Sequence, residues 1–210
     1  LISGIFYDDL GESINQVAGL VLQAKQIGAP VEDATRAALQ FTKVFTDQDP
    51  KAVLNAMNQL VSSGLVKNFK EAGDLLTVAF QNGANRAGDL LNTITTNATA
   101  FKDMGLTGKE AVGLITQGLD AGFKSANDVA NSVTKIKQNV TNAAGNENSD
   151  VTKTLNMLGI ANPADTGKAW SKDFIANVIS SIQNAPVSES EKQKMLSNIL
   201  GGKMGAKEFS

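Results

Sequence analysis

The sequence predicts an all-α protein, a compact array of short antiparallel helical hairpins followed by a smaller C-terminal helical part. Three observations predict this fold. Apolar residues recur at three- and four-residue spacing along nearly the whole chain, as on one face of an α-helix. Helix start and stop signals recur about every 15 to 20 residues. The strict alternation of apolar and polar residues that is typical of half-buried strands is missing.

The apolar stripes place the main helices. An N-terminal helix is predicted over residues 7–27, where Ile14, Val17 and Val21 lie on one face. The same spacing recurs in two later stretches, Val53 to Val61 and Phe174 to Ile182. We therefore expect nine or ten helices of roughly 8 to 20 residues, joined by tight turns.

Polar residues and glycines predict the helix ends. Asp49 stands before Pro50, which suits a capping carboxylate followed by a proline in the first turn. Four pairs have the spacing of a capping box: Asn68 with Glu71, Thr107 with Glu110, Ser125 with Asp128, and Ser188 with Glu191. Helices are predicted to end at six glycines: Gly28, Gly64, Gly83, Gly105, Gly122 and Gly159.

An internal repeat organises the middle of the chain. Residues 71–77 align with 110–116 at a period of 39 residues, and Gly83 and Asp89 then match Gly122 and Asp128 without gaps. A fainter copy begins at Glu32, so that Phe41 matches Phe80. We predict a helical repeat region over 1–141 with hairpin units at about 31–63, 68–100 and 107–140. The apolar face of each unit is expected to pack against the next unit.

The C-terminal third has a different character. Residues 142–150 are small, polar and aperiodic, which predicts an exposed loop. Residues 151–210 are predicted to hold further helices packed on the repeats: a short one near 151–158, one around Trp170, and a last one to Leu200. Pro163 and Pro186 interrupt them, and Trp170 and Phe174 are expected to contact the repeats.

Composition excludes most enzyme classes and many binding classes. The 210 residues include no cysteine and no histidine, which removes disulfide scaffolds, zinc fingers, imidazole bases and thiol nucleophiles. A net charge of -2 argues against a dedicated nucleic-acid binder. No apolar run approaches the roughly 18 residues of a membrane span. The first residue is Leu1 rather than Met, so we expect a fragment of a longer protein.

Each candidate for chemistry has a structural interpretation that we favour. Segment 105–109 lacks the glycine spacing of a phosphate loop and is predicted to start a helix. Lys135 and Lys137 are expected to form the basic end of one helix. The acidic candidates are predicted to serve helix ends: Asp8, Asp9 and Glu12, and Asp74, Asp89 and Asp128. The aromatic candidates are predicted to lie in the core: Phe80, Phe101, Phe123 and Trp170. Two glycosylation sequons begin at Asn97 and Asn139. We predict no catalytic, cofactor-binding or metal-binding residue.

An ordered set of segments between about residue 30 and 205 carries a family resemblance, although no single motif does. The segments are Phe69-Lys-Glu-Ala-Gly-Asp-Leu-Leu76, Gln81-Asn-Gly-Ala-Asn85, Gly88-Asp-Leu-Leu-Asn-Thr-Ile94, Phe101-Lys-Asp-Met-Gly-Leu-Thr107, Gly118-Leu-Asp-Ala-Gly122, Asp128-Val-Ala-Asn-Ser-Val-Thr-Lys135, Leu155-Asn-Met-Leu-Gly-Ile160 and Met195-Leu-Ser-Asn-Ile-Leu-Gly-Gly-Lys203. In this order they resemble the tape measure proteins of tailed phages. The chain departs from that family at Leu200-Gly-Gly202, where Phe-Gly-Thr is usual, and at Ile136 to Val140, which carries less charge.

The resemblance implies a non-enzymatic structural component of the virion tail, made in the host cytoplasm. Tape measure proteins template assembly of the tail tube, set tail length and leave the tube ahead of DNA during ejection. The implied partners are tail tube and tail tip proteins, tail assembly chaperones and further copies of the same chain. Two alternatives stay open: a helical-repeat module that binds a host or viral partner, and a hydrolase with a carboxylate in a cleft.

Overall fold

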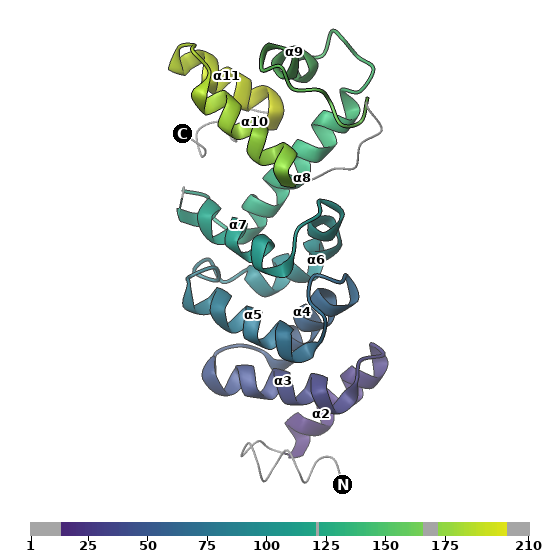
Figure 1. Ribbon diagram of the computed structural model, residues 1–210. Helices are drawn as coiled ribbons and strands as arrows, with labels where there is room; N and C mark the ends of the chain where they lie inside the picture. Colours follow the sequence, from purple (N-terminus) through teal and green to yellow (C-terminus); the bar gives the residue numbers. More distant parts are fainter. Residues whose placement is uncertain (1–13, 121, 166–171, 201–210) are drawn as a thin grey trace. The chain divides into compact units, whose positions relative to one another are not determined.

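The computed structural model describes residues 14–120, 122–165 and 172–200, and these ranges contain ten α-helices and no strand (Figure 1). The predicted all-α class is confirmed. Helices run from 8 to 17 residues, within the expected range. Their bounds are α2 Ile14–Gln26, α3 Val31–Val44, α4 Pro50–Ser62, α5 Phe69–Gln81, α6 Leu90–Asp103, α7 Gly108–Asp120, α8 Ala126–Asn142, α9 Asp150–Met157, α10 Lys172–Asn184 and α11 Glu189–Leu200.

The predicted caps begin the helices as expected. The Asp49 carboxylate accepts hydrogen bonds from the N–H groups of Lys51 and Ala52, ahead of Pro50 in the first turn of α4. Reciprocal capping boxes form at α11 and α7. At α11 the Glu191 N–H donates to the Ser188 hydroxyl, and the Ser188 N–H donates to the Glu191 carboxylate. All six predicted terminal glycines adopt positive φ, between 69° and 109°, where a side chain would be strained.

The chain divides into two compact units. Unit 1 comprises the described residues up to Lys102 together with Thr107–Gly113, and unit 2 comprises Asp103–Leu106 and the described residues from Leu114 onward. The division passes through α7, within the segment predicted as the third hairpin unit. The predicted partition into repeats, loop and C-terminal helices stays a prediction.

In unit 1, α3 packs against α2, α4 and α5. The rings of Phe41 on α3 and Phe80 on α5 meet edge to face with centroids 5.0 Å apart. A Cβ at Gly73 would lie 3.9 Å from that of Ala37. Because 37 contacts 73 and 41 contacts 80, α3 and α5 run in the same direction, as first helices of successive hairpins do. Phe45 completes an aromatic cluster, 4.7 Å from Phe41 and 4.9 Å from Phe80 between centroids.

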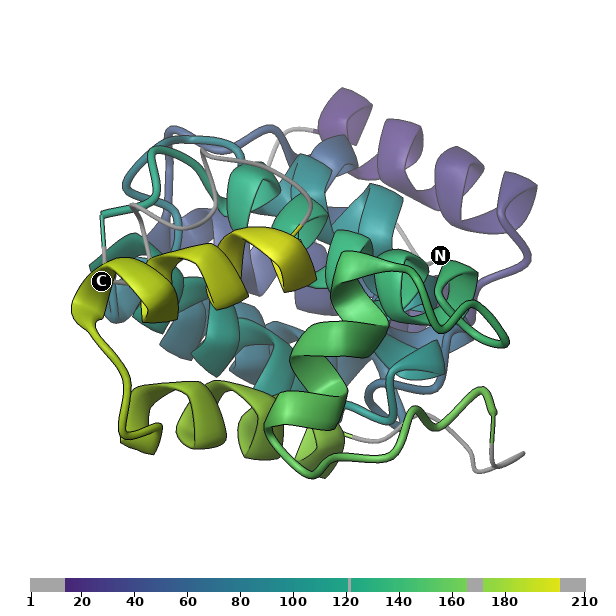
Figure 2. The same ribbon diagram turned by 90° about the horizontal axis from the view of Figure 1, so that it is seen from above.

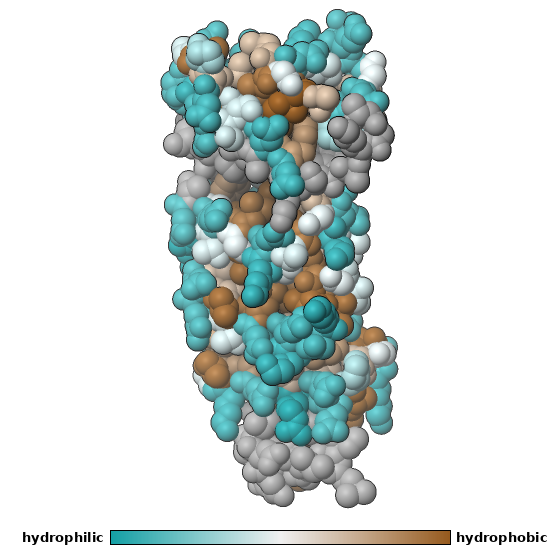
Figure 3. Space-filling model, viewed as in Figure 1, coloured by the Kyte–Doolittle hydropathy of each residue, from teal (hydrophilic) through white to brown (hydrophobic). Residues whose placement is uncertain are grey.

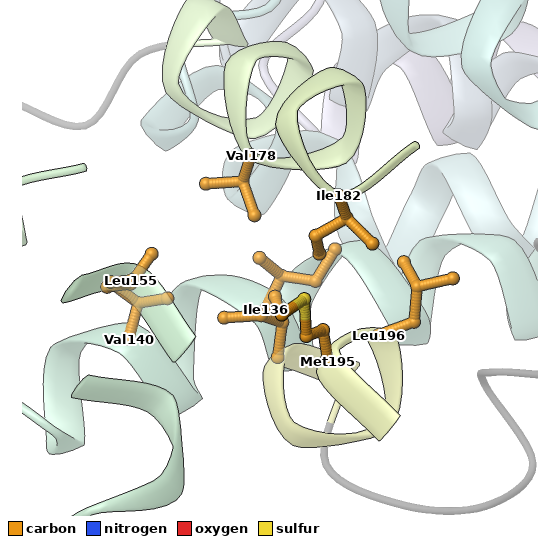
Figure 4. Packing of buried hydrophobic residues seen from close by; sticks show 8 residues of the cluster. Ile136, Val140, Leu155, Val178, Ile182, Met195 and Leu196 are labelled. Carbon is orange, nitrogen blue, oxygen red and sulfur yellow. The ribbon is translucent and has the colours of Figure 1, made fainter. Parts of the chain in front are cut away.

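In unit 2, four helices share one core cluster (Figure 4). Helix α11 packs against α8, α9 and α10, and α10 folds back into α11 through a short connection (Figure 2). Phe174 packs against this cluster, and its predicted contact with the repeats stays a prediction; Trp170 lies outside the described residues. The buried members are Ile136 and Val140 of α8, Leu155 of α9, Val178 and Ile182 of α10, and Met195, Leu196 and Ile199 of α11.

Residues 143–149 between α8 and α9 form turns rather than helix, and most of them are exposed. Several hydrogen bonds hold this segment. The Thr152 hydroxyl donates to the Ala143 carbonyl over 3.1 Å, and the Gly145 N–H donates to the Asp165 carboxylate over 2.7 Å. The buried Asn162 amide donates to the Val140 carbonyl at the end of α8 over 2.8 Å. These contacts attach the loop to the body of unit 2.

Candidate functional site

The candidate functional site is a cleft of about 520 Å³ between α3 and α5 in unit 1. Its position follows from the fold, because two helices that run side by side leave a channel between their outer faces. Phe41, Phe69 and Gly73 lie along it, and polar residues stand on either side. On the α3 side these are Asp33, Arg36 and Gln40, and on the α5 side they are Asn68, Lys70, Asp74 and Thr77.

Charges of both signs stand on both walls of this cleft. On α3, Arg36 pairs with Glu32 at 3.4 Å between guanidinium nitrogen and carboxylate oxygen. On α5, Lys70 pairs with Asp74 at 2.9 Å, and the hydrogen bond and charge of Asp74 raise the pKa of the Lys70 ammonium. Both pairs are one helical turn apart and solvent-exposed, so they contribute little to stability. The cleft therefore presents charges of both signs rather than a field of one sign.

Two exposed valines lie on the same two helices, outside the lining of the cleft. Val44 and Val78, near the C-terminal ends of α3 and α5, are 64% and 50% exposed. Val44 directly precedes the half-buried Phe45, and Val78 lies two residues before the half-buried Phe80. Brown patches stand between teal ones over α3 and α5 in the space-filling view (Figure 3). We name Val44 and Val78 the valine pair.

The cleft was not among the predicted features. The sequence does not single out Arg36 and Lys70, because isolated surface charges at four-residue spacing are common on helices. The faint repeat copy that begins at Glu32 carries the relevant signal, since it predicts that α3 and α5 occupy equivalent places in successive hairpins. Helices at equivalent places in successive hairpins run side by side, and the channel lies between them.

The structure places the predicted glycine-rich candidate at a helix start. The Thr107 N–H and hydroxyl both donate to the Glu110 carboxylate over 2.9 Å, and the Glu110 N–H donates back to the Thr107 hydroxyl. Segment 105–109 is therefore the capping box of α7, as predicted.

The three acidic candidates in the repeats do not converge. Asp74 pairs with Lys70 on α5, and Asp89, directly before α6, accepts a hydrogen bond from the Thr93 hydroxyl at 3.4 Å. The Asp128 N–H donates to Ser125 in the first turn of α8. Asp8, Asp9 and Glu12 lie outside the described residues. Among the residues that the structure describes, no three acidic side chains gather as a metal site would require.

The prediction for Lys135 and Lys137 was wrong. Helix α8 continues to Asn142, so these lysines lie in its interior and its last turn carries no basic residue. The continuation is driven by burial, because Ile136 and Val140 belong to the core of unit 2. Lys137 instead donates to the carbonyl of Asp103, the last residue of α6, over 3.4 Å. Burial of Ile136 and Val140 also accounts for the low charge of residues 136–140.

The remaining candidates have structural roles. Phe101 and Phe123 are buried, as core residues should be. Both sequon asparagines lie within helices: Asn97 donates to the Thr93 carbonyl over 3.0 Å, and Asn139 donates to the Ile199 carbonyl over 3.0 Å. No helix in the described ranges is both long and apolar enough to cross a membrane.

Comparison with known proteins gives the family. The chain matches the phage-related minor tail proteins over residues 7–201. A stretch of 59 residues, 28% of the chain, is 44% identical to a probable tape measure protein of Streptomyces phage phiC31 and covers 8% of that relative. No solved structure matches the chain significantly. The first match extends over nearly the whole sequence, and this chain belongs to the family of phage-related minor tail proteins.

Proposed function

We propose that the chain is a folded region of a tape measure protein, around which tail tube subunits assemble and whose length sets the length of the tail. The family match over residues 7–201 and the likeness to a probable tape measure protein support this proposal. On this proposal the region binds tail tube and tail tip proteins and, during assembly in the host cytoplasm, tail assembly chaperones. It acts in several copies and leaves the tube during DNA ejection.

Helix lengths limit how the region contributes to a ruler. A helix of 13 residues, such as α5, spans only about 20 Å at ~1.5 Å per residue. The 210 residues as one continuous helix would span about 315 Å. Folded into two compact units, the region contributes far less length than that. Two versions of the proposal follow: the region stays folded within the tail, or it unfolds and extends inside the tube.

Deleting one repeat period from the phage or prophage gene tests the ruler role. We expect removal of residues 69–107 to shorten tails by about 60 Å if the region is an extended helix, at ~1.5 Å per residue, and by less if it stays folded. Electron microscopy of tails measures this directly. A length-neutral control replaces 69–107 with a second copy of 108–146. Unchanged tail length after the deletion would contradict a ruler role for this region.

We propose further that the region has no enzymatic activity. The sequence contains no histidine or cysteine. Among the acidic candidates that the structure describes, Asp74, Asp89 and Asp128 serve helix ends or a surface pair. A zymogram on peptidoglycan with the purified chain should show no clearing, and clearing would overturn this part of the proposal.

The cleft and the valine pair favour a second candidate, a helical-repeat module that binds a protein partner. We expect Val44→Ser with Val78→Ser to weaken capture of that partner without unfolding the chain, because both side chains are already half exposed or more. Met157→Ser, at a 68% exposed site in unit 2, is the matched control. Capture of purified tail tube or tip protein supports the tail role. Capture of a host protein alone supports the second candidate.

A further inference from the structure

We propose that Asn82, at the C-terminal end of α5, is a site of spontaneous deamidation at which the protein backbone supplies the nucleophile. Among the asparagines of the sequence, Asn82 alone is followed by glycine. Glycine has no Cβ to shield its nitrogen, and its backbone is the least restricted of all residues. The nitrogen of Gly83 therefore reaches the side chain of the preceding asparagine more readily than that of any other residue would.

The reaction needs no co-reactant except water. The Gly83 nitrogen attacks Cγ of Asn82, a C–N bond forms, and the side-chain nitrogen leaves as ammonia together with the amide proton of Gly83. The product is a cyclic imide. Water adds to one of its two carbonyls, breaks one C–N bond and returns a proton to the nitrogen, which yields aspartate or isoaspartate. Nothing is oxidised or reduced, and the chemistry does not depend on the proposed tail role.

The structure leaves the Asn82 side chain accessible. Asn82 is exposed, and its side chain makes no hydrogen bond within the part of the chain that the structure describes. An added Cβ at Gly83 would meet no atom within 4 Å, so no neighbouring group crowds the attacking residue. Asn85 in the same loop differs, because its side-chain oxygen accepts a hydrogen bond from the Leu90 N–H over 3.0 Å. Asn82 is thus the reactive asparagine of this loop.

Backbone hydrogen bonds restrain the attacking nitrogen without burying it. The Gly83 N–H donates to the Phe80 carbonyl over 3.1 Å, and the Ala84 N–H donates to the Ala79 carbonyl over 2.9 Å. This pair of bonds, with Gly83 at a φ of 76°, is a common way to end a helix. The turn must open before the nitrogen can attack. Helix ends open at a small fraction of the free energy of global unfolding, so the fold slows the reaction without preventing it.

The turn does not require asparagine at this position. In the 39-residue repeat, Asn82 and Gly83 align with Ala121 and Gly122. Gly122 also adopts a positive φ, so the glycine accounts for the turn in both repeats. The asparagine adds no side-chain bond to it. The reactive pair therefore belongs to α5 and not to the repeat as such.

Either product should weaken the end of α5. A carboxylate at residue 82 would stand at the negative end of the helix dipole. Isoaspartate also adds one carbon atom to the backbone between residues 82 and 83, which displaces the N–H groups of Gly83 and Ala84 from their carbonyl partners. Ala84 is fully buried, and Phe80 belongs to the aromatic cluster of unit 1. The change therefore extends from the surface turn into the packing of α3 against α5.

Peptide mapping of the full chain after incubation in mildly alkaline buffer tests the proposal. Conversion appears as the mass difference between an amide and an acid, and aspartate and isoaspartate peptides separate by chromatography. Asn148 is the matched control site: it is exposed, its side chain makes no hydrogen bond among the described residues, and the Ser149 N–H donates to the Asn146 carbonyl over 3.1 Å. We expect Asn82 to convert about tenfold faster, because glycine rather than serine follows it.

A parallel incubation in denaturant measures how much the fold protects the site. We expect Asn82 to convert roughly tenfold more slowly in the folded chain than in the unfolded chain, as local opening of the turn allows. Slowing by about a thousandfold or more would show that conversion requires global unfolding, and would overturn the proposal. A rate at Asn82 no higher than that at Asn148 would also overturn it.

Thermal denaturation tests the consequence for α5. The unsubstituted chain should acquire a lower-melting fraction that grows with its isoaspartate content. Asn82→Ala, which introduces the residue of the next repeat, should melt at the same temperature before and after incubation. Asn82→Asp carries the new charge without the extra backbone atom, so its midpoint should lie between those of the unsubstituted and isoaspartate forms. An unchanged midpoint after full conversion would contradict the predicted weakening of α5.

Discussion

Unit 1 and unit 2 are both helical, but their helices are held together by different kinds of contact. In unit 1, helices at equivalent places in the repeat pack on one another, and Phe41 contacts Phe80 across one period. In unit 2, four consecutive helices enclose a single cluster, and side-chain amides join its elements. Asn139 bonds to the Ile199 carbonyl, and Asn198 bonds to the Thr154 hydroxyl at 3.1 Å. A periodic sequence thus specifies its neighbours in unit 1, whereas unit 2 depends on individual residues far apart in the chain.

Core truncation has the largest expected effect and tests whether the units are energetically separate. Leu76→Ala in unit 1 and Ile182→Ala in unit 2 remove fully buried side chains, and each should cost about 2–5 kcal/mol of unfolding free energy. Hydrogen exchange in mild denaturant should show lost protection in the substituted unit only. Equal loss in both units would show that they unfold as one body.

Gly118→Ala should have the next largest effect, because Gly118 of α7 lies close against Val129 of α8. The added Cβ would lie 2.6 Å from Val129 Cγ2, and the stiff valine side chain has no other rotamer to adopt cheaply. We expect a loss of about 1–3 kcal/mol that outweighs the gain in helix propensity. Chemical denaturation measures it.

Two variants control this prediction. Adding Val129→Ala should recover part of the loss, because it removes the atoms that clash. Gly113→Ala in the same helix should not destabilise the chain, since nothing lies within 4 Å of its added Cβ. If Gly118→Ala is as stable as the unsubstituted chain, α7 and α8 do not approach as closely as described.

Helix ends were predictable because caps act within four residues: Asp49, Thr107 and Ser188 each bond to the first turn that they precede. The place of Lys135 and Lys137 was not, because Ile136 and Val140 are buried against helices from later in the chain and α8 runs on past the lysines to Asn142. Tertiary burial outweighed the local charge signal.

The cleft and the division of α7 were also beyond sequence reasoning. A cleft depends on how closely two helices approach, and its lining residues, such as Arg36 and Lys70, look like ordinary surface charges. The different surroundings of Gly108, Gly113 and Gly118 become visible only when their neighbours are placed. In the sequence alone these three glycines of α7 look alike.

Asn162→Ala should have a moderate effect and tests the polar joints of unit 2. The buried side chain donates to the Val140 carbonyl and accepts from the Ala164 N–H over 3.0 Å. Alanine leaves both groups without that partner, so we expect a loss of about 1–3 kcal/mol by thermal or chemical denaturation. Asn148→Ala is the control, since this residue is exposed and bonds to Asn146 through its backbone N–H. Equal stability of the two variants would contradict a structural role for Asn162.

The smallest expected effect is a pH dependence at the start of α11. Hydrogen bonds from the Ser188 hydroxyl and N–H lower the pKa of the Glu191 carboxyl from its ordinary 4.5. Because the folded pKa is the lower one, this contribution is present above pH 4.5 and is lost as pH falls through the folded value. Ser188→Ala should raise the pKa of Glu191 in a carbon-13 NMR titration. An unchanged titration would show that the hydroxyl is not a donor to this carboxylate.

The most direct test of the structural role is tail length in phages that carry one, two or three extra copies of residues 69–107. We predict that tail length increases in proportion to the number of copies, with a slope no greater than about 1.5 Å per added residue. A slope of zero, with tails assembled and the longer protein present in them, would contradict the account.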